Sequence, residues 1–239
     1  MAGVDPYTYP GQELALFAQA RHWKAYWAAS IGPWVRGDVL EVGAGEGANI
    51  GTLMAVGAGS ILCAEPDPTL FSRLQAAVAS VDPAQQVTAF HGTLADLPAA
   101  RRFNTILYID VLEHIRDEAE ELKLVAERLS VGGHLLVVAP AHPWLFSAFD
   151  RAVGHYRRYS KADFVSFRVE GLDRVTAFYL DSVGMAASLA NRWFVRRPVP
   201  DAGGIRLWDR VVIPLSRVFD LLTFHCMGKS LVGVWRRSA

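Results

Sequence analysis

The sequence predicts an α/β fold: a doubly wound parallel sheet with helices on both of its faces. Two observations support this prediction. Short apolar runs, each long enough for one buried strand, alternate along the chain with segments whose apolar residues recur at helical spacing. The first two of these runs each end in an acidic residue, and the first opens directly onto a glycine-rich turn, as in a strand–helix–strand unit.

The predicted elements alternate along the first 140 residues. Apolar runs predict five strands: 38–42, 60–65, 86–91, 103–109 and 134–139. Helical spacing predicts three helices: 12–31, 68–80 and 117–130. Pro33 ends the first helix, Asp67 or Thr69 begins the second, and Gly132 and Gly133 end the third. The carboxyl ends of the strands therefore form one edge, where ligands of such sheets bind.

Composition limits the classes of protein. The chain has 239 residues, of which 51% are hydrophobic, so we expect one domain with an elaboration. Its 24 basic residues balance 24 acidic ones, so no overall field attracts nucleic acid. Two cysteines exclude a disulfide framework or a cysteine-based zinc site. We see no signal peptide or membrane-spanning run, and expect a cytoplasmic protein whose oligomeric state the sequence does not indicate.

A glycine-rich turn follows the first strand, in the run 39–47. Gly43, Gly45 and Gly47 can adopt positive φ and have no Cβ, so the backbone can turn sharply into a helix beneath a ligand. Glu65 ends the second strand, and its separation from Gly47 is close to the roughly 20 residues typical of nucleoside-binding units. We therefore expect Glu65 to bind the hydroxyls of a ribose.

Charge separates two candidate nucleosides at this turn. The run 43–48 also satisfies G-x-G-x-x-G/A, which leaves an NAD- or FAD-binding oxidoreductase as an alternative. A dinucleotide places a pyrophosphate at the helix N-terminus, where Glu41 and Glu46 would repel it. S-adenosylmethionine (SAM) carries a sulfonium and an ammonium, which carboxylates attract. We therefore favour SAM, with a glycine turn that binds no ligand as the plainest alternative.

Four segments, in order, resemble the motifs of class I SAM-dependent methyltransferases: 39–47, 64–67, 92–98 and 108–115. The likeness covers about residues 35–140 well. It implies a cofactor site made of Glu41, Gly43, Ala44, Gly45, Gly47, Glu65, Pro66, Thr93, Leu94 and Asp110. In this family the second motif holds the ribose, the third holds adenine, and the segment after the fourth strand lines the methionine end.

The third motif departs from the family pattern. Relatives often have an aspartate where this chain has Thr93, so the usual partner of the adenine amino group is missing. A threonine hydroxyl can still accept that hydrogen bond, or Asp96 can replace it. The backbone N–H of Leu94 can still reach a ring nitrogen.

The resemblance also implies the rest of the fold, a three-layer, seven-stranded, mostly parallel, Rossmann-like sheet whose last strand is antiparallel. Runs 172–180 and 230–236 fit the sixth and seventh strands. About fifty residues separate them, far more than a hairpin loop needs. We therefore divide the chain into an N-terminal helical segment (1–34), a SAM-binding core (35–181), a helical cap (182–228) and the last core strand (229–239).

Candidate proton acceptors gather after the fifth strand. Some bacterial members of the family resemble this chain in having a histidine, an aspartate and then a Gly-His-x-Arg-Arg-Tyr run, here 154–159. Our candidate catalytic residues are His155, His142, Asp150, His114 and Tyr159. We prefer His155 as the general base because its unperturbed pKa lies near neutrality, and Asp150 can orient it. The plain alternative is a folded lid whose charged groups bond only one another; histidine and acid spacing predicts no metal site.

The predicted cap is unusually apolar. Residues 205–224 are hydrophobic on more than one stripe, with Arg206, Arg210 and Arg217 among them, and Pro214 should kink or split the helix. A buried cap helix is the preferred interpretation. The alternative interpretation is a hydrophobic substrate channel or a helix that rests on a membrane surface.

Together these observations predict a SAM-dependent methyltransferase that acts on a small organic, hydrophobic or lipid-linked acceptor and not on nucleic acid. Whether oxygen, nitrogen or carbon is methylated is left open. An NAD(P)-dependent oxidoreductase is the enzymatic alternative. A catalytically inactive SAM-fold protein that serves in binding or assembly is the other.

Overall fold

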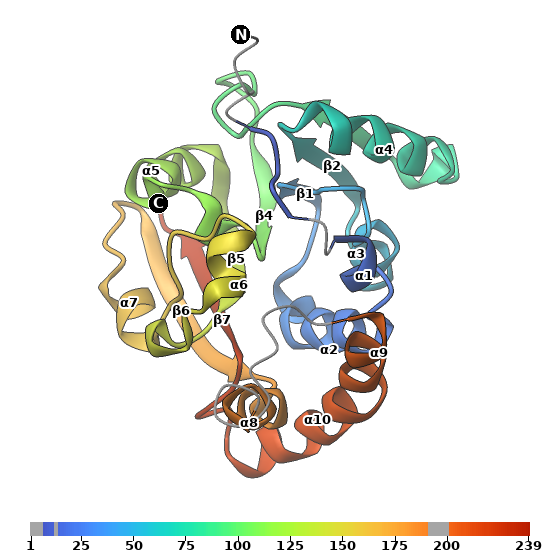
Figure 1. Ribbon diagram of the computed structural model, residues 1–239. Helices are drawn as coiled ribbons and strands as arrows, with labels where there is room; N and C mark the ends of the chain where they lie inside the picture. Colours follow the sequence, from blue (N-terminus) through green and yellow to red (C-terminus); the bar gives the residue numbers. More distant parts are fainter. Residues whose placement is uncertain (1–6, 12–13, 191–200) are drawn as a thin grey trace, which may run out of the picture.

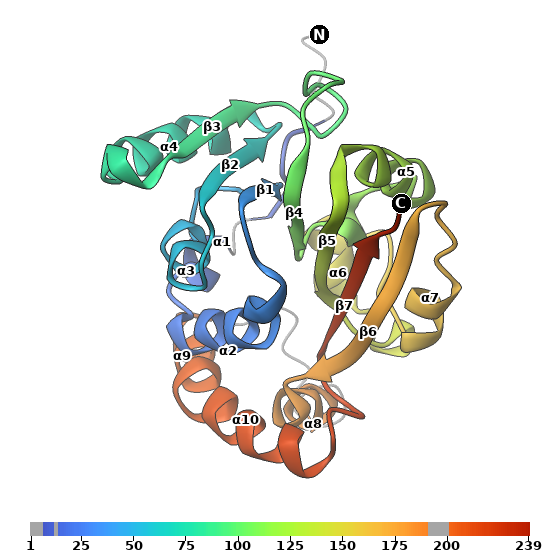
Figure 2. The same cartoon turned by 180° about the vertical axis from the view of Figure 1, so that it is seen from behind.

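The computed structural model describes residues 7–11, 14–190 and 201–239. A seven-stranded sheet forms the centre of the molecule, with strand order β3-β2-β1-β4-β5-β7-β6 (Figures 1 and 2). β7 runs antiparallel to both of its neighbours, and the other pairs are parallel. The predicted doubly wound sheet with an antiparallel last strand is confirmed.

The strands lie close to their predicted places. They are β1 (Asp38–Val42), β2 (Ser60–Glu65), β3 (Val87–His91), β4 (Phe103–Ile109), β5 (Leu129–Pro140), β6 (Leu172–Leu180) and β7 (Ser230–Arg237). The helices of the core are α1 (Leu14–Phe17), α2 (Arg21–Ile31), α3 (Ile50–Ala55), α4 (Pro68–Ala79), α5 (Glu118–Arg128), α6 (Ala148–Ala152) and α7 (Lys161–Ser166). The cap holds α8 (Ser182–Ala190), α9 (Ala202–Leu207), a π-helical segment (Trp208–Val212) and α10 (Ile213–Leu222).

Alternate residues of the central strands face two different cores. Leu40 and Tyr108 belong to the core that also contains residues of α5 and α7. Val39 and Leu107 belong to the core that contains residues of α2, α3, α4 and α10. Because successive strand residues point to opposite faces, each face of the sheet is covered by its own layer of helices.

Two predicted boundaries were wrong. Gly132 and Gly133 do not end a helix: α5 stops at Arg128 and β5 begins at once, with a register shift against β4 in this region. Gly132 has φ 79°, which suits an irregular turn of a strand. The helix expected over 12–31 is broken into α1 and α2, and its first two residues lie outside the described residues.

The break before α2 has a tertiary cause. α2 has no side-chain cap from its own neighbours; instead, Oδ1 of Asp209 accepts the Trp23 backbone N–H at 2.9 Å. The carboxylate thus satisfies a free N–H group at the positive end of the helix. It comes from a residue far away in sequence, so local sequence could not reveal it.

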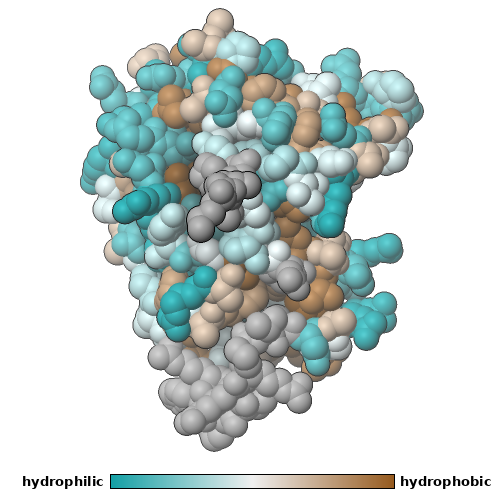
Figure 3. Space-filling view, turned by 45° about the horizontal axis from the view of Figure 1, so that its top comes forward, coloured by the Kyte–Doolittle hydropathy of each residue, from teal (hydrophilic) through white to brown (hydrophobic). Residues whose placement is uncertain are grey.

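The cap inserts between β6 and β7, and β6 points towards α8 (Figure 2). Pro214 lies in the first turn of α10, directly after the π-helical segment, so the predicted disruption of the helix is confirmed. Within the described residues, no helix combines the length and hydrophobicity needed to cross a membrane. The face in Figure 3 mixes hydrophilic and hydrophobic residues, and its outline is notched below the lobe that carries α4.

Candidate active site

The carboxyl edge of the sheet is where the backbone takes unusual conformations. Gly43, after β1, has φ 66°. Asp110, His142 and Asp181 follow β4, β5 and β6 directly, and all three have positive φ, at 53°, 64° and 67°. Non-glycine residues rarely adopt this region, and such strain gathers at functional sites. The edge that the strand pattern predicted as the ligand site therefore carries this signature on three strands, β4, β5 and β6.

The glycine turn has the expected conformation. Gly43, Gly45 and Gly47 all have positive φ. A Cβ on Gly43 would lie 2.8 Å from both methyl groups of Val111, so only glycine fits there. The N–H of Ala44 donates to Ala64 of β2 at 3.0 Å. The turn is thus bound to the second strand through its own backbone.

Glu65 is the residue that joins the turn to the second strand. Its Oε2 accepts the Gly45 N–H at 2.8 Å and its Oε1 accepts the Asp67 N–H at 2.9 Å. Burial raises the pKa of this carboxyl, and the two backbone N–H groups oppose that effect. Each carboxylate oxygen can accept a second hydrogen bond. The structure therefore fixes Glu65 in place with acceptor capacity left for a diol.

The two other acids near the turn, Glu41 and Glu46, contribute less negative charge there than their positions in the sequence suggest. Glu41 is buried, and its Oε1 accepts a hydrogen bond from Asn49 at 2.8 Å. Desolvation raises the pKa of Glu41 to about 7. Glu46 forms an ion pair with Arg73 at the surface. The negative charge facing the turn therefore comes mainly from Glu65, and Glu46 contributes less than we expected.

The loop after β3 is folded by its own side chains. Asp96 accepts hydrogen bonds from the Thr93 hydroxyl at 2.7 Å and from the Thr93 N–H at 2.8 Å. The hydroxyl oxygen keeps acceptor capacity, whereas Asp96 is committed to holding the loop. The side chain of Leu94 is fully buried. Pro66 contributes its carbonyl oxygen to a hydrogen-bond contact with His91 at 3.1 Å.

An N-terminal strap, defined as residues 7–11, crosses this edge of the sheet. The Tyr9 N–H donates to Oδ2 of Asp67 at 2.7 Å, and the Tyr9 ring lies 5.5 Å from the His114 ring, edge to face. A Cβ on Gly154 would lie 3.1 Å from Pro10. The strap thus connects the ends of β2 and β4. Sequence reasoning missed it because the segment has no periodicity.

Asp110 lies at the expected methionine end of the site. Its backbone N–H donates to Val138 of β5 at 2.8 Å. The residue is exposed to solvent, while the surrounding protein still desolvates its carboxyl and raises the pKa to about 6. The nearby charges of His155, Lys229 and Arg158 lower that pKa in turn. Asp110 is therefore ready to attract a cation.

Asp150 and His155 form a bonded pair. Nδ1 of His155 lies 3.0 Å from Oδ1 of Asp150. Arg158 binds both oxygens of the same carboxylate, at 2.7 and 3.0 Å, and Ser147 donates to it twice. These hydrogen bonds hold the pKa of Asp150 well below its usual range despite its burial. A charged aspartate at Nδ1 favours the tautomer whose Nε2 can accept a proton.

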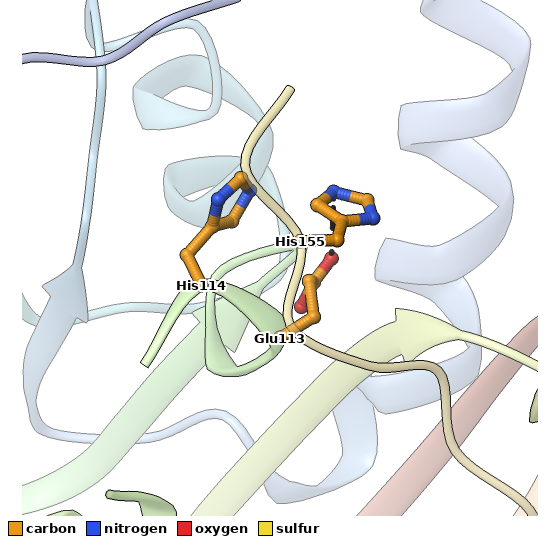
Figure 4. A group of neighbouring side chains, drawn as sticks. All are labelled: Glu113, His114 and His155. Carbon is orange, nitrogen blue, oxygen red and sulfur yellow. Dashed lines mark ion pairs between the residues drawn. The ribbon is translucent and has the colours of Figure 1, made fainter. Parts of the chain in front are cut away.

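Glu113 lies on the other side of the imidazole. Its Oε1 is 3.8 Å from Nε2 of His155 (Figure 4). The carboxyl is fully buried, and neither oxygen has a hydrogen-bond partner among the described residues. Burial raises the pKa of Glu113 well above its ordinary value and so favours the neutral form of the carboxyl. Glu113 falls within the motif at 108–115, but its place in the sequence did not reveal that it belongs to the site.

His114 stands beside His155, with ring centroids 4.6 Å apart and planes nearly perpendicular (Figure 4). Burial, together with His155, lowers the pKa of His114 to about 4. The ligand atoms of Glu113, His114 and His155 lie within 4.8 Å of one another, so this group could also hold a metal ion. The sequence had not pointed to such a group.

Two of the candidate catalytic residues lie elsewhere. His142 stacks on Tyr179 with ring centroids 4.8 Å apart, and burial lowers its pKa. Tyr159 packs in the core with Phe164, and its hydroxyl donates to Glu118 at 2.6 Å. We therefore correct the assignment of Tyr159, whose contacts are structural. The structure brings together Asp150, His155 and His114, and it leaves His142 outside this group.

Comparison with known proteins decides the family. The model of a protein family described as a methyltransferase domain matches residues 15–195 of this chain. The chain belongs to the methyltransferase-domain family. Because the match covers more than half of the chain, it favours this assignment over the oxidoreductase alternative.

The relatives of this methyltransferase domain are distant. A tRNA U34 carboxymethyltransferase of Shewanella halifaxensis is 25% identical over 137 residues, which are 55% of this chain and 40% of that protein. The match thus spans less than half the length of that relative. Its counterpart from Shewanella putrefaciens is 25% identical over 120 residues, 48% of this chain and 36% of that protein.

Solved structures share the fold. A SAM-dependent methyltransferase of Mesorhizobium loti has a TM-score of 0.61 at 17% identity, over 93% of this chain and all of that one. The N-methyltransferase NodS of Bradyrhizobium japonicum, in complex with S-adenosylhomocysteine, has a TM-score of 0.56 at 15% identity, over 92% and 86%. These structures confirm the predicted fold, and the match to the methyltransferase domain family supports SAM as the cofactor.

The residues of the methyltransferase domain fit this cofactor. A side chain on Gly43 would collide with Val111, so a bare backbone is kept at the turn. A fixed, buried Glu65 with spare acceptor capacity suits a ribose diol. Arg73 is the basic residue ion-paired beside the turn, and Glu46 neutralises it, which suits a cofactor without a pyrophosphate.

Proposed function

We propose that the protein transfers the methyl group of SAM to a small hydrophobic or lipid-linked acceptor, with His155 as the general base. The pairing of His155 with Asp150, next to Asp110 at the methionine end, is the observation that carries this proposal. When bound, SAM supplies an activated methyl group and its leaving group. The protein has to align the acceptor and remove its proton.

The proton route follows from the hydrogen bonds. Asp150 is charged and fixed by Arg158, so it holds the Nδ1 proton of His155 and orients the ring. Nε2 then accepts the proton of the acceptor, and the charged Asp150 stabilises the imidazolium that forms. Neutral Glu113, beneath Nε2, adds no competing charge. His114 is neutral as well, so it does not repel the imidazolium.

A tRNA acceptor is the second candidate, because the distant relatives are named tRNA U34 carboxymethyltransferases. Against it, the 24 basic residues of the chain are balanced by 24 acidic ones. The chain therefore lacks the overall excess of basic residues that is typical of proteins that bind nucleic acid. The exposed apolar residues of the cap support a hydrophobic acceptor instead.

One labelling experiment separates these acceptors. The protein is incubated with SAM carrying a radioactive methyl group and with three fractions of the source cells: a lipid extract, water-soluble metabolites and total tRNA. Label in the organic phase is the expected result. Label in tRNA would establish the second candidate. Tight S-adenosylhomocysteine binding with no label in any fraction would instead support an inactive binding protein.

A further inference from the structure

The cap helix over 202–222 buries polar residues and exposes apolar ones. The buried positions of the helix over 202–222 recur every three or four residues, and three of the five are polar: Ile205, Asp209, Ile213, Ser216 and Asp220. The exposed positions of the same stretch are rich in large apolar residues: Leu207, Val211, Leu215, Val218, Phe219, Leu221 and Leu222. A surface helix normally turns its apolar stripe inward. This helix has the opposite arrangement.

Hydrogen bonds hold the polar stripe in place. Asp220 accepts the Tyr26 hydroxyl at 2.7 Å and the N–H groups of Asp181 and Ser182 at 2.7 and 2.9 Å. The Ser216 hydroxyl donates to Asp181 at 2.7 Å. Asp209 caps α2, as described above. Because rotation of the helix would break all of these bonds, the apolar side chains are fixed at the surface.

The charged residues of the helix are also divided between its two faces, with the basic ones exposed and the acidic ones buried. Arg206, Arg210 and Arg217 are exposed, whereas Asp209 and Asp220, the acids of residues 202–224, are both buried. The outer face is therefore apolar and positively charged. A second copy of the chain packed on this face about a two-fold axis would bring arginines against arginines. An anionic lipid surface offers both an apolar interior and negative headgroups.

We propose that the outer face of α9 and α10 docks on an anionic membrane surface, with the helix lying in the plane of the headgroups. The exposed leucines, valines and Phe219 enter the boundary of the acyl chains, and Arg206 and Arg210 reach the phosphates. In Figures 1 and 2 these helices lie along the outer rim of the molecule.

The cap joins the proposed membrane-docking face to the sheet edge that holds the candidate active site. α8 begins directly after Asp181 at the carboxyl edge of the sheet, and α10 packs against both α8 and β6. The edge that holds the site is thus connected to the docking face by one layer of helices. This relation to the acceptor rests on the proposed function, whereas the docking itself does not.

Vesicle binding tests the proposal. The full chain is sedimented with vesicles of phosphatidylcholine alone and of phosphatidylcholine with one third phosphatidylglycerol. We expect binding to the anionic vesicles that is at least about tenfold tighter and that weakens with salt. Equal binding to both vesicles, or binding to neither, would overturn the proposal. The same would follow from a concentration-dependent dimer that Leu222→Ser dissociates, since the face would then serve self-association.

Surface variants make the test specific. Arg206→Gln with Arg210→Gln should weaken vesicle binding about 25-fold, at about fivefold for each charge. Val218→Ser with Leu222→Ser should weaken it on neutral and anionic vesicles alike. Val131→Ser with Arg102→Gln, exposed residues outside the cap, is the matched control and should bind like the wild type. All three should keep the S-adenosylhomocysteine affinity and melting temperature of the wild type, which separates this proposal from the proposed reaction.

Discussion

Nδ1 of His155 lies 3.0 Å from Oδ1 of Asp150, and Arg158 holds the same carboxylate through two nitrogens. This relationship fixes both the orientation and the tautomer of the imidazole. It also distinguishes His155 from the other histidines near the carboxyl edge. His114 has a pKa lowered to about 4, and His142 is stacked against Tyr179.

His155→Ala should therefore reduce turnover by about 100- to 10,000-fold, the usual contribution of a general base. The affinity for S-adenosylhomocysteine should stay within about twofold of the wild type, because His155 takes no part in holding the glycine turn. Initial rates and calorimetry measure the two quantities separately. The acceptor found by labelling serves as substrate.

His142→Asn is the matched comparison for that variant. It removes a histidine from the same loop region, outside the group formed with Asp150. We expect turnover close to that of the wild type. If His142→Asn abolished turnover while His155→Ala preserved it, the base would have to be reassigned.

Glu65→Gln should weaken S-adenosylhomocysteine binding by at least about tenfold, because hydrogen bonds to a charged acceptor contribute about 1.5–3 kcal/mol. Glu46→Gln removes a charge equally near the turn, but one already paired with Arg73, so its effect should be about twofold or less. Calorimetry on both variants gives the comparison. Equal losses would mean that the general negative field, and not the position of Glu65, selects the cofactor.

Chelation tests the alternative use of the cluster of Glu113, His114 and His155. A metal ion would occupy the nitrogen that the proposed base needs. We expect turnover to be unchanged after dialysis against a chelator and not to rise when Mn²⁺ or Zn²⁺ is added. Loss of turnover on chelation, restored by one of these ions, would make His155 a metal ligand instead of the base.

The free energy of unfolding should depend on pH through the ionisation of Glu41. Its pKa is about 7 in the fold, against 4.5 for an ordinary glutamate, so between these values the folded state binds more protons than the unfolded state. The contribution of Glu41 is thus fully present below about pH 4.5 and is lost as pH rises through 7. The free energy of unfolding of Glu41→Gln, relative to wild type, should increase by about 3 kcal/mol between pH 4.5 and 8. Urea unfolding at several pH values measures it, and a constant difference would contradict the assignment.

Much of the fold could be predicted because its signals are local. The apolar runs of β1, β2 and β4 and the glycines at 43, 45 and 47 are visible in sequence. What could not be predicted depends on contacts between distant residues. Asp209 caps α2 from the other end of the chain, and Arg73 neutralises Glu46. The same holds for Glu113, whose burial beneath His155 only the tertiary structure reveals.

In the cap, by contrast, the local hydrophobic pattern predicted the wrong face as buried. Its composition predicts a buried helix, since apolar residues usually face the core. The structure reverses the faces because Asp209, Ser216 and Asp220 have partners on α2 and around Asp181. Hydrophobic pattern alone cannot distinguish these two outcomes. The preferred interpretation of the cap as a buried helix was therefore wrong for its apolar face.

A crystal structure with S-adenosylhomocysteine tests the central claim most directly. We predict that both ribose hydroxyls bind the Glu65 carboxylate and that the sulfur lies at the Asp110 end, with an open path to Nε2 of His155. A ribose bound elsewhere, or a sulfur that Glu113 and His114 separate from His155, would contradict the account.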